Sequence, residues 1–392
     1  MTHVPVDQPT TADAAAHDFP FPVPDYRFDQ RNEMFKRRTW DDHIHSHVDR
    51  LYSEVHHQER YGFRKLDYAL RNAAWSIESG FGLGTQCGNH GLFSWDYVTE
   101  KVKHHAETGD PVTHSPEANA RIVKKAARFF GAASVGTCHA HPNLIYSHEL
   151  NLLTSEHHPI ELPEGCEHAI VMTVAMDHGS IHYSPDALTG AATGLGYSQQ
   201  AVLANLMAAF IRGLGYRAVP SGNDTALSIP LAIAAGLGEL GRMGLLITEK
   251  YGPRVRICKV FTDLPLRHDG FRPFGVADFC RTCKKCATHC SAQAISFGEP
   301  TMEGPSPASH SGVRKWYIEP EKCYLFWAQN WMDCSRCVAV CPFNKPPGRQ
   351  HDMVRFFIRR FPQLNRLWLL ANDWAGHGRQ TAGRTEGFWE ST

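Results

Sequence analysis

The segment FCRTCKKCATHC, residues 279–290, places four cysteines at the spacing C-x2-C-x2-C-x3-C. A second group has the spacing C-x10-C-x2-C-x3-C and ends in CVAVCPF, residues 337–343. Two runs of this kind are the ligand sets of a pair of 4Fe-4S clusters. Because neighbouring clusters conduct single electrons, we expect a ferredoxin-like domain that delivers electrons to a redox centre elsewhere in the chain.

The spacing also predicts which cysteines share a cluster. The fourth cysteine of each run leaves on a helix and reaches the other cluster, so ligation is expected to be crossed. The first cluster is assigned to Cys280, Cys283, Cys286 and Cys341. The second cluster is assigned to Cys290, Cys323, Cys334 and Cys337. Ten residues, 324–333, replace the usual two in the second run, and we expect a loop there.

Two other uses of clustered cysteines fit less well. Zinc sites favour two separate C-x2-C pairs over two runs of four. Disulfide frameworks belong to short secreted chains, whereas this chain has 392 residues. The remaining cysteines fit neither cluster run, and we interpret them as ordinary small apolar residues: Cys87, Cys138, Cys166 and Cys258.

Composition places the chain among globular proteins of about two domains. Hydrophobic residues make up 42% of it and charged residues 20%. Lys plus Arg and Asp plus Glu both number 40, and this balance argues against a nucleic-acid binder. The 24 histidines are scattered, without a zinc-type motif. The sequence does not determine the oligomeric state, and a homodimer is compatible with it.

The location of the protein is predicted from segments that the sequence lacks. It has no apolar run long enough for a transmembrane helix. The N-terminus has neither a basic region nor an apolar region of the secretory type. We therefore expect a cytoplasmic protein, although an exported protein whose leader has been removed would read the same.

Upstream of the cysteines, apolar periodicity predicts a mixed core. A helix is expected over residues 115–130, opened by Ser115 as its cap, and buried strands over 132–138 and 168–176. A second helix is predicted over about 198–214, with Val202 and Leu206 on its apolar face. Further strands are expected at 216–219 and 255–266.

A glycine-rich run follows the helix that starts at Ser228 and is predicted to continue it. It lacks the arrangement of a dinucleotide-binding fingerprint. Its glycines permit close backbone approach, either to a cofactor or between packed elements.

The residues of both cysteine groups, the glycine-rich run and the segment 255–257 together resemble the corrinoid-dependent reductive dehalogenases. The resemblance is strong over about 195–345 and weaker over 26–194. It implies an α+β fold, in which a nitroreductase-like cobalamin-binding core is joined to a bacterial ferredoxin-like two-cluster domain. It also implies a cobamide bound base-off beside two 4Fe-4S clusters. The residues predicted to contact the corrinoid are Gly236, Gly238, Arg242 and Gly244.

The same resemblance assigns a catalytic trio. The tyrosine of the family matches Tyr197, its neighbouring asparagine or lysine matches Asn223, and its arginine matches Arg256. Cleavage of a carbon–halogen bond leaves a carbon that needs a proton, which the phenol of Tyr197 would donate. A neighbouring arginine cation stabilises the tyrosinate that remains.

The sequence is predicted to divide into four parts. These are a flexible N-terminal arm (1–25), a cobamide-binding catalytic core (26–268), the ferredoxin-like domain (269–348) and a C-terminal helical tail that packs on the core (349–392). The chain is too short to hold the flavin reductase domain that some catabolic members carry. An external donor, a ferredoxin or a flavodoxin/reductase, is then expected to supply electrons.

The leading function is therefore the replacement of halogen by hydrogen on a small organohalide, with a haloaromatic substrate expected. Two alternatives stay open. Epoxyqueuosine reductase has the same cofactor plan, but needs an aspartate as proton donor and a basic face for tRNA. An iron–sulfur subunit without its own chemistry would not need the long segment that precedes the cysteines.

Overall fold

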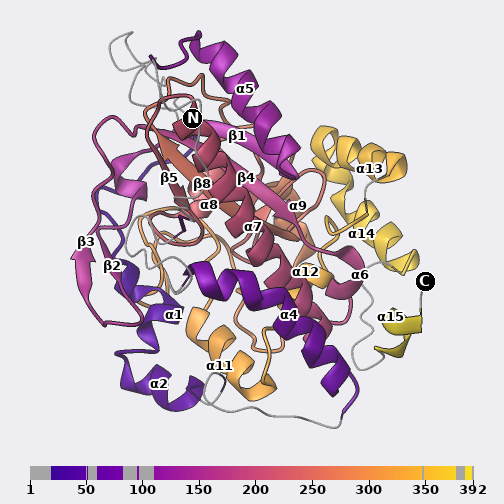
Figure 1. The fold of residues 1–392 in the computed structure, drawn as a ribbon. Helices are drawn as coiled ribbons and strands as arrows, with labels where there is room; N and C mark the ends of the chain where they lie inside the picture. The colour runs from indigo at the N-terminus through magenta and orange to yellow at the C-terminus, as the bar shows by residue number, and fades with distance from the viewer. Residues whose placement is uncertain are drawn as a thin grey trace, which may run out of the picture.

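The computed structural model describes residues 19–49, 51, 60–82, 95–96, 110–346, 348–376 and 385–390. A four-stranded sheet lies at its centre, with the order β1-β4-β8-β5 (Figure 1). The strands are β1 (Ser134–His139), β4 (His168–Ala175), β8 (Val255–Thr262) and β5 (Ala218–Ser221). Every pairing is antiparallel, so the expected α+β class is confirmed.

Both faces of the sheet are covered by helices, which explains why its strands read as continuous apolar runs. Side chains alternate between the faces. Met172 and Cys258 pack with α5 (Pro116–Phe129) and α7 (Ala187–Gly213). Val171 and Phe261 pack on the opposite side with α8 (Ser228–Ala234). The helix α4 (Lys65–Gly82) lies against α7 (Figure 1).

The predicted capping residue of one helix is confirmed, whereas the predicted start of another helix is wrong. Ser115 caps α5 by accepting a hydrogen bond from the backbone N–H of Ala118. The helix α7, however, begins at Ala187 rather than near 198, because small residues let it pack on both α4 and the sheet. The predicted apolar face is also wrong: Val202 and Leu206 are 39% and 42% exposed, whereas Leu203 and Met207 are buried.

The helix α8 ends at Ala234, so the glycine-rich run does not continue it, contrary to prediction. Gly236 has a φ of +71°, a left-handed conformation that ends the helix. The rest of the run forms a short hairpin of β6 (Glu239–Leu240) and β7 (Leu246–Ile247).

The cysteine-bearing part contains two similar units. The first holds α9 (Val276–Cys283) and α10 (Lys285–Thr288), and the second holds α11 (Pro320–Asn330) and α12 (Arg336–Ala339). Lys284 and Ser335 occupy the same place in the two C-x2-C turns, and both have a positive φ, 54° and 52°. The ten-residue insertion lies mostly in α11, so the expected loop is a helix instead.

The N-terminal segment closes one side of the molecule. It contains η1 (Gln30–Asn32), α1 (Met34–Arg37) and α2 (Asp42–Val48), and α2 packs on α11. Beside it lie η4 (Pro142–Leu144) and a hairpin of β2 (His148–Leu150) and β3 (His157–Pro159). The short helix α6 (His178–Ile181) follows β4. Residues 1–18 of the predicted arm lie outside the described residues.

The tail is helical, with α13 (Arg349–Arg360), η5 (Pro362–Leu364), α14 (Asn365–Trp374) and α15 (Glu386–Glu390). It breaks near Pro362, as predicted. The helix α14 contacts α9 of the cysteine-bearing part. The helix α15 contacts the core, where the Trp389 indole donates to Asp67. The packing of the whole tail on the core stays a prediction.

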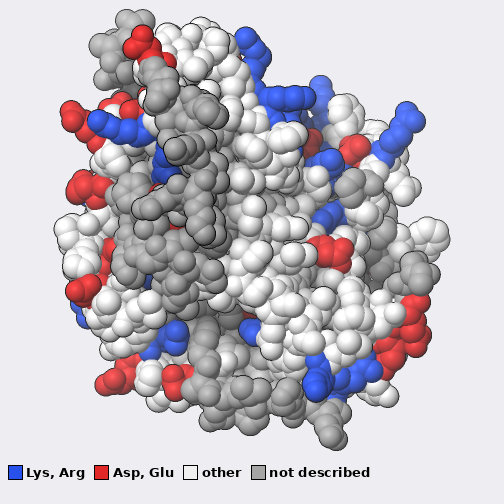
Figure 2. Space-filling view, viewed as in Figure 1, with Lys and Arg blue, Asp and Glu red and all other residues white. Residues whose placement is uncertain are grey.

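Charged residues of both signs occur on the face of the molecule shown in Figure 2. Figure 2 shows Lys and Arg interspersed with Asp and Glu on the face it presents, without a continuous basic band there. Among the described residues, no helix has the length and apolar character needed to cross a membrane.

Candidate active site

A cavity of about 890 Å³ separates the sheet from the cysteine-bearing part. One wall comes from α7, the turn after β5 and the start of β8, and it carries Tyr197, Asn223 and Arg256. The opposite wall carries Cys290, Cys323, Cys334 and Cys337. The predicted catalytic trio and the whole predicted second cluster set therefore line one space.

The trio is joined by direct contacts. The Asn223 amide donates to the Tyr197 hydroxyl at 2.9 Å, and the Arg256 guanidinium donates to the same oxygen at 3.3 Å. The guanidinium carbon also lies 4.5 Å from the centre of the Tyr197 ring, in cation–π contact. A second hydrogen bond, to the Thr193 hydroxyl at 3.2 Å, fixes the arginine from α7.

Strand alternation explains why Arg256 meets Tyr197. Arg256 shares the parity of Cys258 and Val260, which pack toward α7. Tyr197 lies within α7 rather than at the start of a helix as the sequence suggested. Its ring stacks on Trp75 of α4, with centroids 5.3 Å apart. Gly194 permits this, because a Cβ there would lie 2.3 Å from the Trp75 ring.

The turn that carries Asn223 is held by a buried lysine that the sequence analysis missed. Lys259 is fully buried in β8 and donates to the backbone oxygens of Gly222 and Asp224 and to the Ser228 hydroxyl. Burial lowers the pKa of Lys259 to about 8, and Asp224 partly opposes this effect. The signal was available as a second cation, besides Arg256, inside a buried strand that is mostly apolar.

The cysteines gather into the two predicted sets. The thiol of Cys341 interacts electrostatically with those of Cys280, Cys283 and Cys286. Cys323 interacts in the same way with Cys334 and Cys290. A separate small cavity is lined by the first set, together with Arg242 and Lys284. Each predicted cluster set thus surrounds or borders a space of its own.

The chemistry of the thiols fits bound clusters. Burial, with a smaller contribution from neighbouring thiols, raises the pKa of both Cys280 and Cys286 to about 12. The described cysteines form no disulfide. Thiolates this buried and this close are unfavourable alone, whereas an iron cluster takes them deprotonated and compensates their charge.

The large cavity also fits an extended cofactor with a polar rim. Several residues of its wall hold buried polar atoms that lack a hydrogen-bond partner among the described residues. These atoms are Arg256 Nε, His310 Nε2, Asp333 Oδ2 and Arg336 Nε. A corrinoid, which carries amides around a broad apolar ring, supplies partners of this kind.

The predicted corrinoid contacts are only partly placed at the cavity. Gly244 lines it. Gly236 and Gly238 instead pack against backbone, since a Cβ would lie 2.5 Å from the oxygen of Gly270 and 2.3 Å from that of Ile247. These two glycines therefore serve close packing between elements.

Arg242 faces the first cysteine set and not the large cavity. It is fully buried and donates to the backbone oxygens of Cys280, Ser296 and Gly298, at 2.7–3.1 Å. Its guanidinium also lies 4.5 Å from the centre of the Trp316 ring. These contacts stabilise the cysteine-bearing part.

Comparison with known proteins agrees with this geometry. Residues 279–345 match the 4Fe-4S dicluster domain family. The tetrachloroethene reductive dehalogenase of Desulfitobacterium hafniense is 35% identical over 395 residues, covering 84% of this chain and 71% of its own length. That of Sulfurospirillum multivorans is 34% identical, covering 81% and 69%.

Solved structures share the fold. A catabolic reductive dehalogenase superposes with a TM-score of 0.71 at 24% identity, over 90% of this chain. This chain spans 46% of the length of that protein. An epoxyqueuosine reductase of Leadbetterella byssophila matches only 31% of this chain, at 32% identity.

Proposed function

This chain belongs to the reductive dehalogenase family, and we propose that it replaces a halogen of a small organohalide by hydrogen within the 890 Å³ cavity. One observation carries the proposal. The hydroxyl of Tyr197, contacted by both Asn223 and Arg256, faces the same cavity as the cysteines of the second set. A proton source and an electron source therefore border one space.

The cofactors follow from the family, as predicted: a cobamide and two 4Fe-4S clusters. When bound, the cobamide supplies the reductive cleavage of the carbon–halogen bond. We assign its site to the large cavity, with Gly244, Met243 and Leu245 on its wall. The second cysteine set borders that cavity, and the first set lies farther from it, so electrons enter through the first set.

Each residue of the trio has a separate role in the proton transfer. Tyr197 holds a proton at its hydroxyl oxygen and passes it to the carbon that loses the halogen. Arg256 stabilises the tyrosinate by its positive charge, by its hydrogen bond to the phenolic oxygen and by its cation–π contact with the ring. Asn223 fixes the direction of the hydroxyl, because the Asn223 amide donates to it and leaves the phenolic proton free to point into the cavity.

The substrate class is proposed more broadly than the sequence suggested. The haloaromatic prediction stays a prediction. The curated relatives are named for tetrachloroethene, and a solved relative is described in complex with 3-bromo-4-hydroxybenzoic acid. We propose an organohalide of either kind, reduced with electrons from an external ferredoxin or flavodoxin/reductase.

The test is anaerobic reconstitution with cobamide, iron and sulfide, followed by halide release from chlorinated alkenes and brominated phenols. Tyr197→Phe should lower turnover at least about a hundredfold while cobalt and iron contents stay unchanged. Tyr183→Phe is the matched control, because Tyr183 packs on Phe388 away from the cavity. Full turnover by the Tyr197 variant would refute the proton role, and failure to bind cobamide would refute the function.

A further inference from the structure

Three side chains with metal-ligand atoms meet beside the hairpin of β2 and β3. Asp29, His148 and His157 each offer one ligand atom, and these atoms all lie within 4.8 Å of one another. Among the described residues, no other group of three His, Cys, Asp or Glu side chains meets this condition. None of the three residues lines the large cavity, so the proposed dehalogenation does not use them.

Strand register places the two histidines on one face of the hairpin. His148 lies opposite Pro159, and Leu150 lies opposite His157. Because residues two apart on a strand share a face, His148 and His157 are diagonal neighbours on that face. Their rings are stacked, with centroids 4.6 Å apart and an interplanar angle of 26°. Two imidazoles arranged side by side in this way can both bind one ion.

The carboxylate of the group comes from the N-terminal segment. Asp29 caps η1, and its Oδ1 accepts a hydrogen bond from the backbone N–H of Arg31 at 2.9 Å. The same oxygen lies 3.0 Å from Nε2 of His157. Because an ionised carboxylate only accepts, this imidazole nitrogen carries the proton of the contact. A metal ion bound here takes the place of that proton.

The separation of the ligand atoms suits zinc after a small adjustment. Zinc binds nitrogen and oxygen ligands at about 2.0–2.2 Å in a tetrahedron, which puts neighbouring ligand atoms about 3.4 Å apart. The 3.0 Å contact of Asp29 with His157 is close to this value, and the ligand atom of His148 has to approach by at most about 1.4 Å. The Ser147 hydroxyl lies 3.1 Å from Nδ1 of His148, which leaves Nε2 for the ion.

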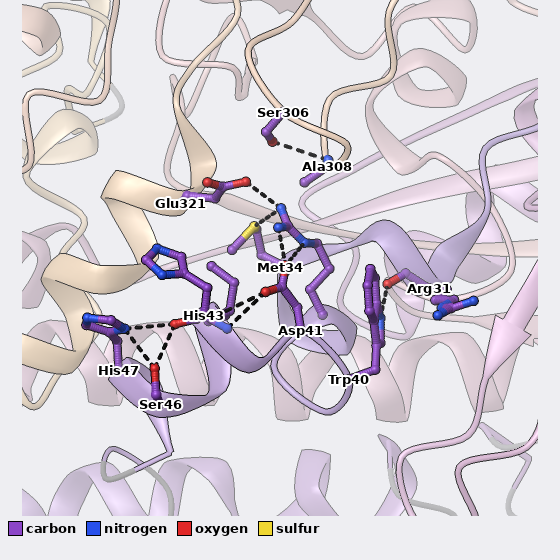
Figure 3. A network of polar contacts seen from close by, with 12 residues as sticks. Arg31, Met34, Trp40, Asp41, His43, Ser46, His47, Ser306, Ala308 and Glu321 are labelled. Atoms are coloured by element: carbon purple, nitrogen blue, oxygen red, sulfur yellow. Dashed lines mark hydrogen bonds and ion pairs between the residues drawn. The ribbon is translucent and has the colours of Figure 1, made fainter.

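Two basic side chains of the N-terminal segment lie near the group, and both are engaged elsewhere. The guanidinium of Arg31 lies over the Trp40 ring, 4.4 Å from its centre (Figure 3). Lys36 donates to the backbone oxygen of Leu150 at 2.6 Å and interacts electrostatically with Glu149. The side chains of the ligand pair are 28% and 32% exposed, so an ion can reach them from solvent.

We propose that Asp29, His148 and His157 form a zinc site that links the N-terminal segment to the hairpin of β2 and β3, with water as the fourth ligand. Two imidazoles and one carboxylate are a ligand set typical of zinc, whereas magnesium and calcium prefer oxygen ligands alone. The segment is already joined to α11 by the ion pair of Arg37 with Glu321. A zinc ion would fix its other end, on the side of η1.

The test is an anaerobic calorimetric titration of the cluster-loaded protein with Zn²⁺, with Mg²⁺ as the comparison ion. One Zn²⁺ per chain should bind, and Mg²⁺ should not compete with it. X-ray absorption at the zinc edge should then show only nitrogen and oxygen ligands, at about 2.0–2.2 Å. Zinc held by the cluster cysteines would instead show sulfur at about 2.3 Å.

Two variants remove one ligand each. His148→Phe keeps an aromatic ring against His157 and should weaken zinc binding at least about a hundredfold, since even the partners of zinc ligands account for about 10–100-fold. Asp29→Asn keeps a good capping residue for η1, removes the charge and should also weaken binding. The matched control is His43→Phe, because His43 and His47 form another close pair on α2, with ring centroids 5.0 Å apart, but belong to no group of three. The control should bind zinc unchanged.

The link between the two segments has its own measurement. Backbone hydrogen exchange in residues 29–34 and 148–159 should slow when zinc is added to the unsubstituted protein, and should not change in His148→Phe. Unchanged exchange with zinc bound would overturn the link. Sulfur ligands, equal affinity of the two ligand variants and the unsubstituted protein, or no binding at about 0.1 mM Zn²⁺ would overturn the site. None of these results would alter the dehalogenase proposal, which halide release tests separately.

Discussion

Arg37 of α1 and Glu321 of α11 form an ion pair of 2.5 Å that joins the N-terminal segment to the helix carrying Cys323 (Figure 3). The Arg37 side chain is 8% exposed and also pairs with Asp41. One guanidinium thus fixes two segments that border the cavity, the one with Glu33 and the one with a predicted cluster ligand.

Replacing Arg37 should destabilise this junction. Arg37→Met leaves two carboxylates without their cation and should lower the free energy of unfolding by about 2–3 kcal/mol. Chemical denaturation under anaerobic conditions measures this. Lys322→Met, which breaks the exposed pair with Glu319, is the control and should change stability by less than about 0.5 kcal/mol. Equal effects of the two variants would contradict the role given to Arg37.

The arginine of the trio should not tolerate lysine. Arg256 lies over the Tyr197 ring while donating to both Tyr197 and Thr193. A lysine has no planar fork and cannot keep all three contacts. Arg256→Lys is expected to lower kcat about tenfold or more, with KM, cobalt and iron nearly unchanged. A rise in KM alone would show that the arginine acts in binding instead.

Lys259 should matter for both stability and turnover, although it lies behind the trio. Lys259→Met removes the donor to two backbone oxygens of the turn that carries Asn223 and to the Ser228 hydroxyl of α8. The loss should be about 3 kcal/mol, because Asp224 is left buried without its cation. Lys259→Met combined with Asp224→Asn should recover part of the stability. If the double variant is no better than the single one, the pairing is not what stabilises the turn.

If ligation is crossed as predicted, two alanine variants should each damage a different cluster. Cys341→Ala should damage the cluster of Cys280, Cys283 and Cys286, and Cys290→Ala the cluster that borders the cavity. Each variant should keep about half of the iron, and the electron paramagnetic resonance signals of the two should differ. Damage by Cys290→Ala to the cluster of Cys280, Cys283 and Cys286 would show that ligation is not crossed.

Acid should destabilise the protein through three histidines that are buried or partly buried. Burial lowers the pKa of His168, His178 and His310 to about 4, each below the ordinary value of 6.5. The unfolded chain then binds more protons than the native one, so stability is present above pH 6.5 and is lost as pH falls toward 4. Unfolding midpoints across this range measure the loss. His310→Met should flatten the dependence, and an unchanged slope would exclude His310 as a contributor.

Features that depend on residues close together in the sequence could be predicted from the sequence. The cysteine runs predicted the two groups in which the thiols gather, since three thiolates must converge within one turn of chain. The caps and strands of the core were also predicted, because Ser115 and the apolar runs act over a few residues. The length of α7 and its buried face were missed, since both depend on packing against α4 and the sheet.

The sequence by itself predicted the cofactor type and, through a family resemblance, the candidate trio of Tyr197, Asn223 and Arg256. Only the tertiary structure shows that Gly244 lines the cavity, that Arg242 contacts the cysteine-bearing part, and that Lys259 holds the turn of Asn223. It also shows that Glu33 lines the cavity. The physical reason is that the contacts and the pKa of a buried charged side chain depend on partners that are far away in the sequence. Glu33 and Asn223 line the same cavity although 190 positions separate them in the sequence, and no spacing in the sequence encodes that arrangement.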